Sequence, residues 1–127
     1  MTEKYIRIPF KQHGRDFDGC DCFGLVKLVL KTEYGIDLPD PYYTDSTDID
    51  HNAGLVDVLK PTMDVSPVCV PRNGDIVLMI KGGQPSHVGV YVDGSVLHTT
   101  ERLGTVCEKI GGITLKGGSI FGFYRRD

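Results

Sequence analysis

The sequence predicts an α+β fold in which one N-terminal helix is followed by about five antiparallel strands. Apolar residues recur at helical spacing in residues 22–34, whereas short apolar or alternating runs separated by turn residues fill the chain after residue 73. Helices and strands that are segregated along the chain in this way are typical of the α+β class. The 16 glycines among 127 residues also favour a sheet with many tight turns.

The predicted helix spans residues 22–34. Its apolar face is formed by four residues at near-helical spacing: Leu25, Val26, Val29 and Leu30. Asp21 is suited to the N-cap position, because its carboxylate can accept a hydrogen bond from the first turn. Gly35 is suited to end the helix in a left-handed conformation.

The strands are predicted in the C-terminal half of the chain, at residues 75–80, 87–92, 95–99, 105–110 and 120–124. Residues 1–19 are interpreted as an extended lead-in, and the proline-rich residues 36–72 as a covering loop with a short helix at 53–60. We expect residues 1–127 to form a single domain, since this is the length of one ordinary domain.

Charge and hydropathy exclude two classes of partner. The net charge is −3, and the longest basic run is Arg125-Arg126, so we expect no nucleic-acid binding. No apolar stretch approaches the roughly 18 residues of a membrane span, so we expect no membrane insertion. Residues 1–10 are too polar for a signal peptide, so synthesis and retention in the cytoplasm, with reduced cysteines, are expected unless export follows another route.

Cys22 is the candidate nucleophile. If Asp21 is the N-cap, Cys22 is the first helical residue, and the positive end of the helix dipole favours its thiolate. Gly24 is expected to leave the first turn open to a substrate. The alternative is that Cys22 is a small buried residue of a core helix. We expect Cys69 and Cys107 to lie in apolar surroundings and to be unreactive.

Two histidines are predicted to meet on one face of a hairpin. A two-residue turn at Asp93-Gly94 would place His98 opposite Gly89. His87 then shares the face of His98 as a diagonal neighbour, and Gly89 leaves the space between them open. One imidazole could take the thiol proton of Cys22 while the other orients it, as a cysteine–histidine catalytic unit requires.

Metal sites are weakly supported. Cys20 and Cys22, with the spare histidines His13 and His51, lack the spacing and the second cysteine pair of a structural zinc site. The acidic residues at 45–50 lack the glycine and the terminal glutamate of an EF-hand loop. We therefore expect no metal and no organic cofactor.

Several of these segments together resemble a known family. Residues 21–26 (DCFGLV), 73–78 (NGDIVL) and 86–92 (SHVGVYV), with Leu97-His98 after them, are similar to the motifs of NlpC-type cell-wall cysteine peptidases. The likeness covers roughly residues 9–100. It implies a papain-like α+β fold, with the N-terminal helix that carries the nucleophile packed on a five- to six-stranded antiparallel sheet.

The resemblance also implies an activity. It implies a thiol hydrolase that cleaves peptide-stem amide bonds of bacterial peptidoglycan, commonly the bond between D-glutamate and the diamino acid. Cys22 would be the nucleophile and His87 the base, and His98 stands where the family carries its third catalytic residue.

The chain resembles in particular short versions of the family that occur in tailed phages. The similarity lies in Leu38-Pro39-Asp40 after the helix and in the terminal residues 122–125 (GFYR). It implies incorporation in a phage tail or virion, contact with tail-tip proteins, and local penetration of the cell wall. The alternative is a structural tail-assembly protein that keeps the fold with weak or no activity.

Two residues depart from the family pattern. Phe23 replaces a small serine beside the nucleophile. Phe10 stands where the family often carries a tyrosine, and because phenylalanine lacks the hydroxyl, Phe10 cannot donate a hydrogen bond. The backbone N–H of Cys22 remains as an oxyanion donor, and Gln12 or His13 could supply a second. The candidates for the substrate cleft are Phe10, Gln12, His13, Phe23 and Ser86.

Overall fold

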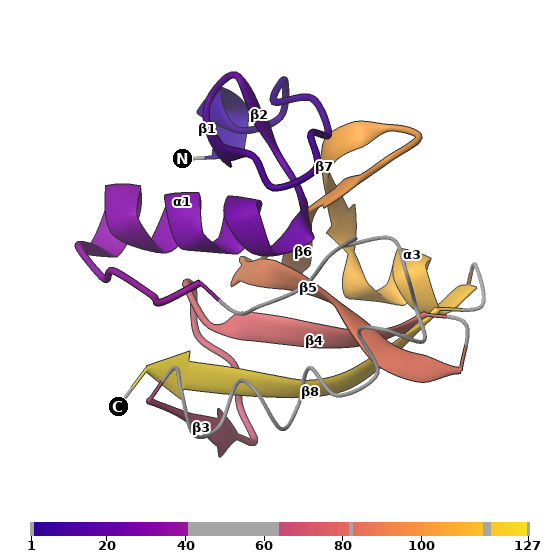
Figure 1. The fold of residues 1–127 in the computed structure, drawn as a ribbon. Helices are drawn as coiled ribbons and strands as arrows, with labels where there is room; N and C mark the ends of the chain where they lie inside the picture. Colours follow the sequence, from indigo (N-terminus) through magenta and orange to yellow (C-terminus); the bar gives the residue numbers. More distant parts are fainter. Residues whose placement is uncertain (1, 41–63, 82, 116–117, 127) are drawn as a thin grey trace.

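A computed structural model describes residues 2–40, 64–81, 83–115 and 118–126 of the chain. One helix, α1 (Cys22–Tyr34), lies on one face of a six-stranded antiparallel sheet (Figure 1). The sheet order is β3-β8-β4-β5-β6-β7. The strands are β3 (Val65–Val68), β4 (Ile76–Lys81), β5 (Gln84–Val92), β6 (Ser95–Thr100), β7 (Gly104–Lys109) and β8 (Ser119–Arg126). The predicted α+β architecture is therefore confirmed.

Helix α1 begins and ends at the predicted residues. The Asp21 side chain caps its first turn by accepting a hydrogen bond from the Gly24 N–H at 2.8 Å. Gly35 ends the helix with φ of 67°, a conformation that costs a side-chain-bearing residue free energy, and its N–H donates to the Lys31 carbonyl. None of the described helices has the length and apolar character that a membrane span requires.

The sheet buries side chains on both faces because successive residues of a strand point to opposite sides. On the α1 side they join the helix in the main core, which includes Leu25, Val26, Val29, Leu78, Val88, Val90 and Leu97. On the other side a smaller cluster forms under the short helix α3 (Ile110–Leu115) and contains Val77, Met79, Val96 and Ile113. The two faces of the sheet are therefore distinct environments.

Some elements differ from the sequence prediction. Strand β5 begins at Gln84 rather than at residue 87, and strand β7 ends at Lys109, where α3 begins. Helix α3 contains Gly111 and Gly112, which are poor helix formers, so its sequence does not indicate a helix. The predicted helix at 53–60 lies outside the described residues.

Short elements precede α1 where only an extended segment was predicted. They are a 3-10 turn, η1 (Thr2–Lys4), and a two-stranded hairpin of β1 (Arg15–Asp16) and β2 (Gly19–Cys20). The hairpin packs against α1, and it brings Arg15 to the start of the helix.

The residues that carry the short-form resemblance also hold the fold together. Leu38 is fully buried in the main core. Arg125 donates from Nε and Nη2 to the two carboxylate oxygens of the buried Asp75, at 2.8 and 2.7 Å. This pair ties the last strand to the start of β4 across 50 positions of sequence.

Candidate active site

Cys22 is the first residue of α1, and its residue surface is only 6% exposed. It packs in the main core cluster, at the end of the helix where the backbone N–H groups carry partial positive charge. Helix α1 contacts β5 and β6, the two strands that carry His87 and His98. The sequence prediction therefore places the thiol correctly at a helix start.

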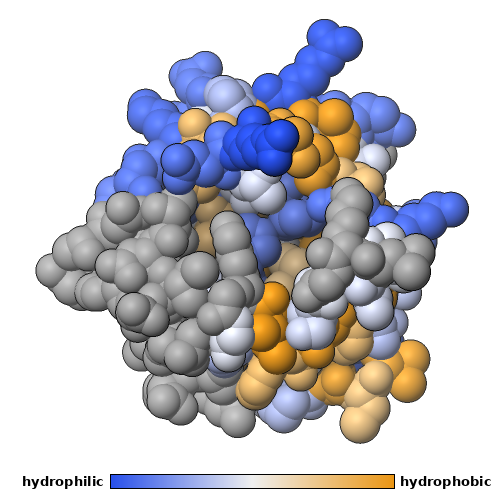
Figure 2. All heavy atoms as spheres, turned by 90° about the vertical axis from the view of Figure 1, so that its right-hand side faces the viewer, coloured by the Kyte–Doolittle hydropathy of each residue, from blue (hydrophilic) through white to orange (hydrophobic). Residues whose placement is uncertain are grey.

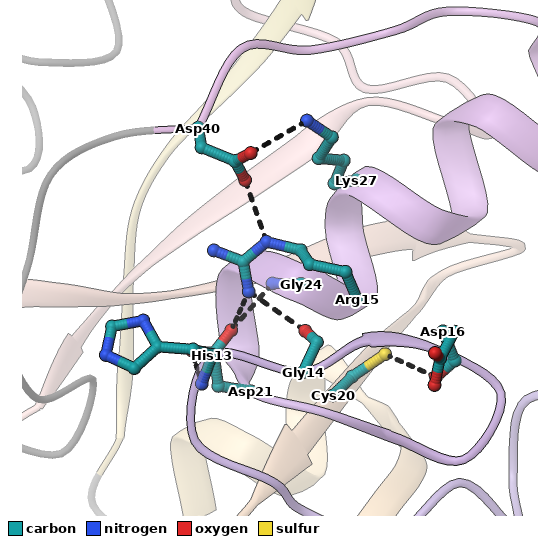
Figure 3. A network of polar contacts seen from close by, with 9 residues as sticks. All are labelled: His13, Gly14, Arg15, Asp16, Cys20, Asp21, Gly24, Lys27 and Asp40. Atoms are coloured by element: carbon teal, nitrogen blue, oxygen red, sulfur yellow. Dashed lines mark hydrogen bonds and ion pairs between the residues drawn. The ribbon is translucent and has the colours of Figure 1, made fainter.

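Asp21 is completely buried and organises the start of the helix (Figure 3). Its Oδ1 accepts from the Gly24 N–H at 2.8 Å and lies 3.0 Å from Nη1 of Arg15, while its Oδ2 accepts from the His13 N–H at 2.9 Å. The guanidinium of Arg15 compensates the carboxylate charge, which would otherwise oppose a thiolate on Cys22. The Arg15 cation therefore lies beside the N-cap carboxylate of the helical turn that contains Cys22.

The same network continues to the segment after α1. Nε of Arg15 donates to Oδ1 of Asp40 at 2.7 Å, and Nζ of Lys27 donates to Oδ2 of Asp40 at 3.1 Å. Burial alone would raise the pKa of the Asp40 carboxyl, but its hydrogen bonds to Arg15 and Lys27 outweigh burial, and the pKa is lowered. These contacts join the β1 strand, helix α1 and the segment after the helix around the first turn of α1 (Figure 3).

Gly24 does not leave the first helical turn open, contrary to the sequence expectation. A Cβ atom at this position would lie 1.9 Å from the Gly14 carbonyl oxygen and 2.8 Å from Nη1 of Arg15. The glycine is therefore required by the close approach of the lead-in backbone, which covers this side of the helix.

The hairpin that carries the two histidines has the predicted turn. Asp93 and Gly94 both adopt positive φ, 48° and 82°, as a two-residue type I′ turn requires. The ladder of β5 and β6 pairs Val92 with Ser95, Tyr91 with Val96 and Val90 with Leu97. It ends there, so the predicted pairing of Gly89 with His98 is not part of the ladder.

His87 and His98 nevertheless meet on one face, as predicted. Nε2 of His87 lies 2.9 Å from Nδ1 of His98, and the rings are nearly perpendicular, with centroids 5.1 Å apart. A Cβ atom at Gly89 would lie 3.0 Å from the Cβ of His98 and 2.8 Å from the Leu97 carbonyl oxygen. Only glycine therefore fits beside the histidine pair.

Sequence reasoning missed Glu108, which extends the histidine pair. Its Oε1 lies 2.9 Å from Nε2 of His98. In the register of β6 and β7, His98 pairs with Val106, so Glu108 is the diagonal neighbour two residues further on the same face. The loop between the strands is three residues long and ends at Gly104 with φ of 72°. This glycine is the one sequence signal that could have indicated the register.

The chain His87–His98–Glu108 lines a pocket of about 220 Å³. The remaining lining residues come from β4, β6, α3 and the start of β8: Met79, Ile80, Thr100, Ile113, Gly118 and Ser119. Helix α3 lies on the right-hand side of Figure 1. Figure 2 views the molecule from that side and shows hydrophilic atoms near the centre, with hydrophobic atoms above and below.

None of the substrate-cleft candidates is among the described residues that line this pocket. Phe23 is 3% exposed in the main core, with the Arg15 guanidinium 5.7 Å from its ring centroid, so it offers little surface to a substrate. Ser86 is also buried. Phe10 and Gln12 are half-buried and His13 is exposed, with its imidazole directed away from the Asp21 network in Figure 3.

The other cysteines differ from Cys22 in their surroundings. Cys20 is buried, its thiol donates to the Asp16 carbonyl at 3.2 Å, and burial, aided by nearby Asp21, raises its pKa to about 12. Cys69 and Cys107 are exposed, so the expectation that apolar surroundings enclose them is wrong. Partial burial still raises the pKa of Cys107. Among the described residues, no three His, Cys, Asp or Glu side chains are grouped so as to hold a metal ion.

A helix with a cysteine at its start, packed on an antiparallel sheet with a histidine pair, defines a papain-like α+β protein. Within that class the sequence matches the NlpC/P60 family over residues 7–114, and the chain belongs to this family. The fold is similar to the crystal structure of the NlpC/p60 domain of peptidoglycan hydrolase SagA, with a TM-score of 0.59 and 19% identity. That similarity covers 92% of this chain and 87% of the SagA chain. A sequence search of curated proteins finds no match.

Proposed function

We propose that this protein is a cysteine peptidase that hydrolyses peptide-stem amide bonds of bacterial peptidoglycan. The observation that carries the proposal is the 2.9 Å contact between His87 and His98, on strands that pack against the helix whose first residue is Cys22. Membership of the NlpC/P60 family and the similarity to a domain of a peptidoglycan hydrolase support the same class of reaction.

In the proposed reaction, His87 takes the proton of the Cys22 thiol, and the thiolate attacks the amide carbonyl carbon. The tetrahedral intermediate collapses, the C–N bond breaks, and His87 gives its proton to the leaving amine. A thioester then joins the acyl group to Cys22. Water loses a proton to His87 and attacks this thioester, which releases a carboxylic acid and restores the thiol. No metal or organic cofactor takes part in these steps.

The β5–β6 ladder ends before it reaches the histidines. Val90 and Leu97 form the last ladder pair, although β5 continues to Gln84 and β6 to Thr100. Backbone pairing is therefore absent between the two strands at the level of the histidines. We assign the approach of Cys22 from the start of α1 to this gap in the ladder.

The oxyanion of the tetrahedral intermediate needs at least two donors. The backbone N–H of Cys22 is one, because the first N–H groups of a helix have no partner within the helix. The backbone N–H of His13 already donates to Asp21, so a contribution from His13 would come from its imidazole. The side-chain amide of Gln12 is the alternative donor.

The test is digestion of purified peptidoglycan, with the released fragments identified by mass spectrometry. Wild type should release fragments with new amino and carboxyl ends, Cys22→Ala should release none, and Cys20→Ser should retain most of the activity. The fragment masses also test the proposed scissile bond between D-glutamate and the diamino acid. Equal traces of fragments from wild type and Cys22→Ala at high protein concentration would refute the proposed peptidase activity.

The proposed setting is a phage tail or virion, where the protein would contact tail-tip proteins. This part rests on the sequence resemblance at Leu38-Pro39-Asp40 and residues 122–125. Mass spectrometry of purified virions tests it. If the chain is present in virions and Cys22→Ala virions infect normally, a structural role in tail assembly replaces the catalytic one.

A further inference from the structure

We propose that Glu108 is a positioning residue that sets the tautomers of His98 and His87. The geometry that supports it is a continuous chain of two 2.9 Å contacts, from Oε1 of Glu108 to Nε2 of His98 and from Nδ1 of His98 to Nε2 of His87. The catalytic consequence rests on the proposed function, whereas the tautomer assignment does not.

The direction of the hydrogen bonds follows from the acceptor at the end of the chain. An ionised carboxylate has no proton to donate, so Nε2 of His98 must carry the proton in its contact with Glu108. In a neutral imidazole only one ring nitrogen is protonated, so Nδ1 of His98 is then an acceptor. It can accept only from a protonated Nε2 of His87.

The consequence appears at the far end of the chain. With its proton on Nε2, a neutral His87 has a lone pair on Nδ1, and this lone pair can take the proton of a thiol. If both hydrogen bonds ran in the opposite direction, Nδ1 of His87 would carry the proton. This nitrogen could then not accept the proton of the thiol. Glu108 therefore selects the tautomer in which His87 can act on Cys22.

Apart from the two histidines, Glu108 is the titratable side chain among the described residues that line the pocket. The described residues that β4, α3 and the start of β8 with its preceding residue contribute to the pocket carry no charge: Met79, Ile80, Ile113, Gly118 and Ser119. From β6 the neighbouring polar residue of the pocket is Thr100, which is neutral. His98 has a side chain only 7% exposed, so water has little access to its ring, whereas the Glu108 side chain is 21% exposed.

The test compares Glu108→Gln and Glu108→Asp with wild type, with Glu101→Gln as a matched control in the exposed turn of the same hairpin. A glutamine amide can donate as well as accept, so it no longer dictates the tautomer, whereas aspartate keeps a pure acceptor. Two quantities are measured: the ¹⁵N chemical shifts of the His98 and His87 rings, which report the tautomer, and kcat and KM for a soluble stem peptide.

We expect wild type, Glu108→Asp and Glu101→Gln to hold His98 with its proton on Nε2, and Glu108→Gln to populate the other tautomer. We expect Glu108→Gln to lower kcat about 10- to 100-fold with KM unchanged. This is less than the roughly 10⁴-fold loss that follows when an aspartate bonded directly to a catalytic histidine is replaced by asparagine. Glu108→Asp should recover part of that loss.

Two outcomes overturn the proposal. The first is an unchanged tautomer and rate in Glu108→Gln. The second, which decides the matter if Glu108→Gln does not fold, is a loss of the Nε2-protonated form in Glu108→Asp. If wild type and Cys22→Ala are equally inactive, the proposed function fails, and the ring shifts still decide whether Glu108 selects the tautomer.

Discussion

The guanidinium of Arg15 and the carboxylate of Asp21 form an ion pair of 3.0 Å in which the carboxylate is fully buried. Two backbone N–H groups, from Gly24 and His13, also donate to the Asp21 carboxylate. The pair joins the β1 strand to the first turn of α1, so it connects the stability of the fold with the position of Cys22.

Arg15→Leu should destabilise the protein by about 3 kcal/mol, because it leaves the buried Asp21 carboxylate without its cation. Urea denaturation measures the free energy of unfolding, and Arg7→Leu, at an exposed position of the lead-in, is the matched control. A loss for Arg15→Leu no larger than that of the control would show that the backbone donors alone suffice for Asp21.

The ionised Asp40 carboxylate should stabilise the folded protein at neutral pH and lose this contribution in acid. Its carboxyl has a pKa below the ordinary value of 3.8, because Arg15 and Lys27 favour the ionised form. A lowered pKa in the folded state means that the contribution is complete well above 3.8 and is lost as the pH falls through the folded pKa. Wild type should therefore melt at a higher temperature than Asp40→Asn at pH 7, and the difference should shrink as the pH falls below 3.8. A difference that persists at low pH would contradict this origin.

Cys22 should be the thiol that iodoacetamide labels fastest at neutral pH. The helix start favours its thiolate, whereas burial holds the Cys20 pKa at about 12 and partial burial raises that of Cys107. Mass spectrometry of tryptic peptides over time measures the four rates. Since Cys69 and Cys107 are exposed, they are the internal controls for access. Faster labelling at Cys20 or Cys107 would argue against an activated Cys22.

His87→Ala should reduce peptidoglycan hydrolysis nearly as much as Cys22→Ala, because the two residues act as one unit in the proton transfer. The double variant should then be no slower than either single variant, since losses within one catalytic unit are not additive. His98→Ala should cost less, because His98 orients the base and does not exchange a proton with the substrate. Additive losses for Cys22→Ala and His87→Ala would separate the two residues functionally.

The isolated protein should turn over slowly, and Phe10→Tyr should leave the rate unchanged or raise it. A missing oxyanion donor typically costs about 100- to 1000-fold in rate, and Phe10 cannot supply the hydroxyl that the family often has at this place. Steady-state rates on a soluble stem peptide measure the effect, with Phe10→Leu as a control for packing. A clearly slower Phe10→Tyr would show that the hydroxyl is not accommodated.

The sequence by itself determined the features that depend on neighbouring residues. Asp21 and Gly35 are the caps that start and end α1, and their local backbone preferences made both ends predictable. The Asp93-Gly94 turn has only one common geometry, so parity alone brought His87 and His98 to one face. Five of the six strands and the family followed from the sequence patterns, whereas β3 (Val65–Val68) lies in residues that were predicted to form a covering loop.

Only the tertiary structure decided which residues complete the site. The place of Glu108 depends on the length of the loop after Thr100, because a shift of one residue would turn its side chain to the other face. Whether Phe23 faces a substrate or the core depends on the hairpin that brings Arg15 over its ring. Such contacts join residues of different helices and strands. Their free energy comes from burial and from pairing across strands, which local sequence preferences do not specify.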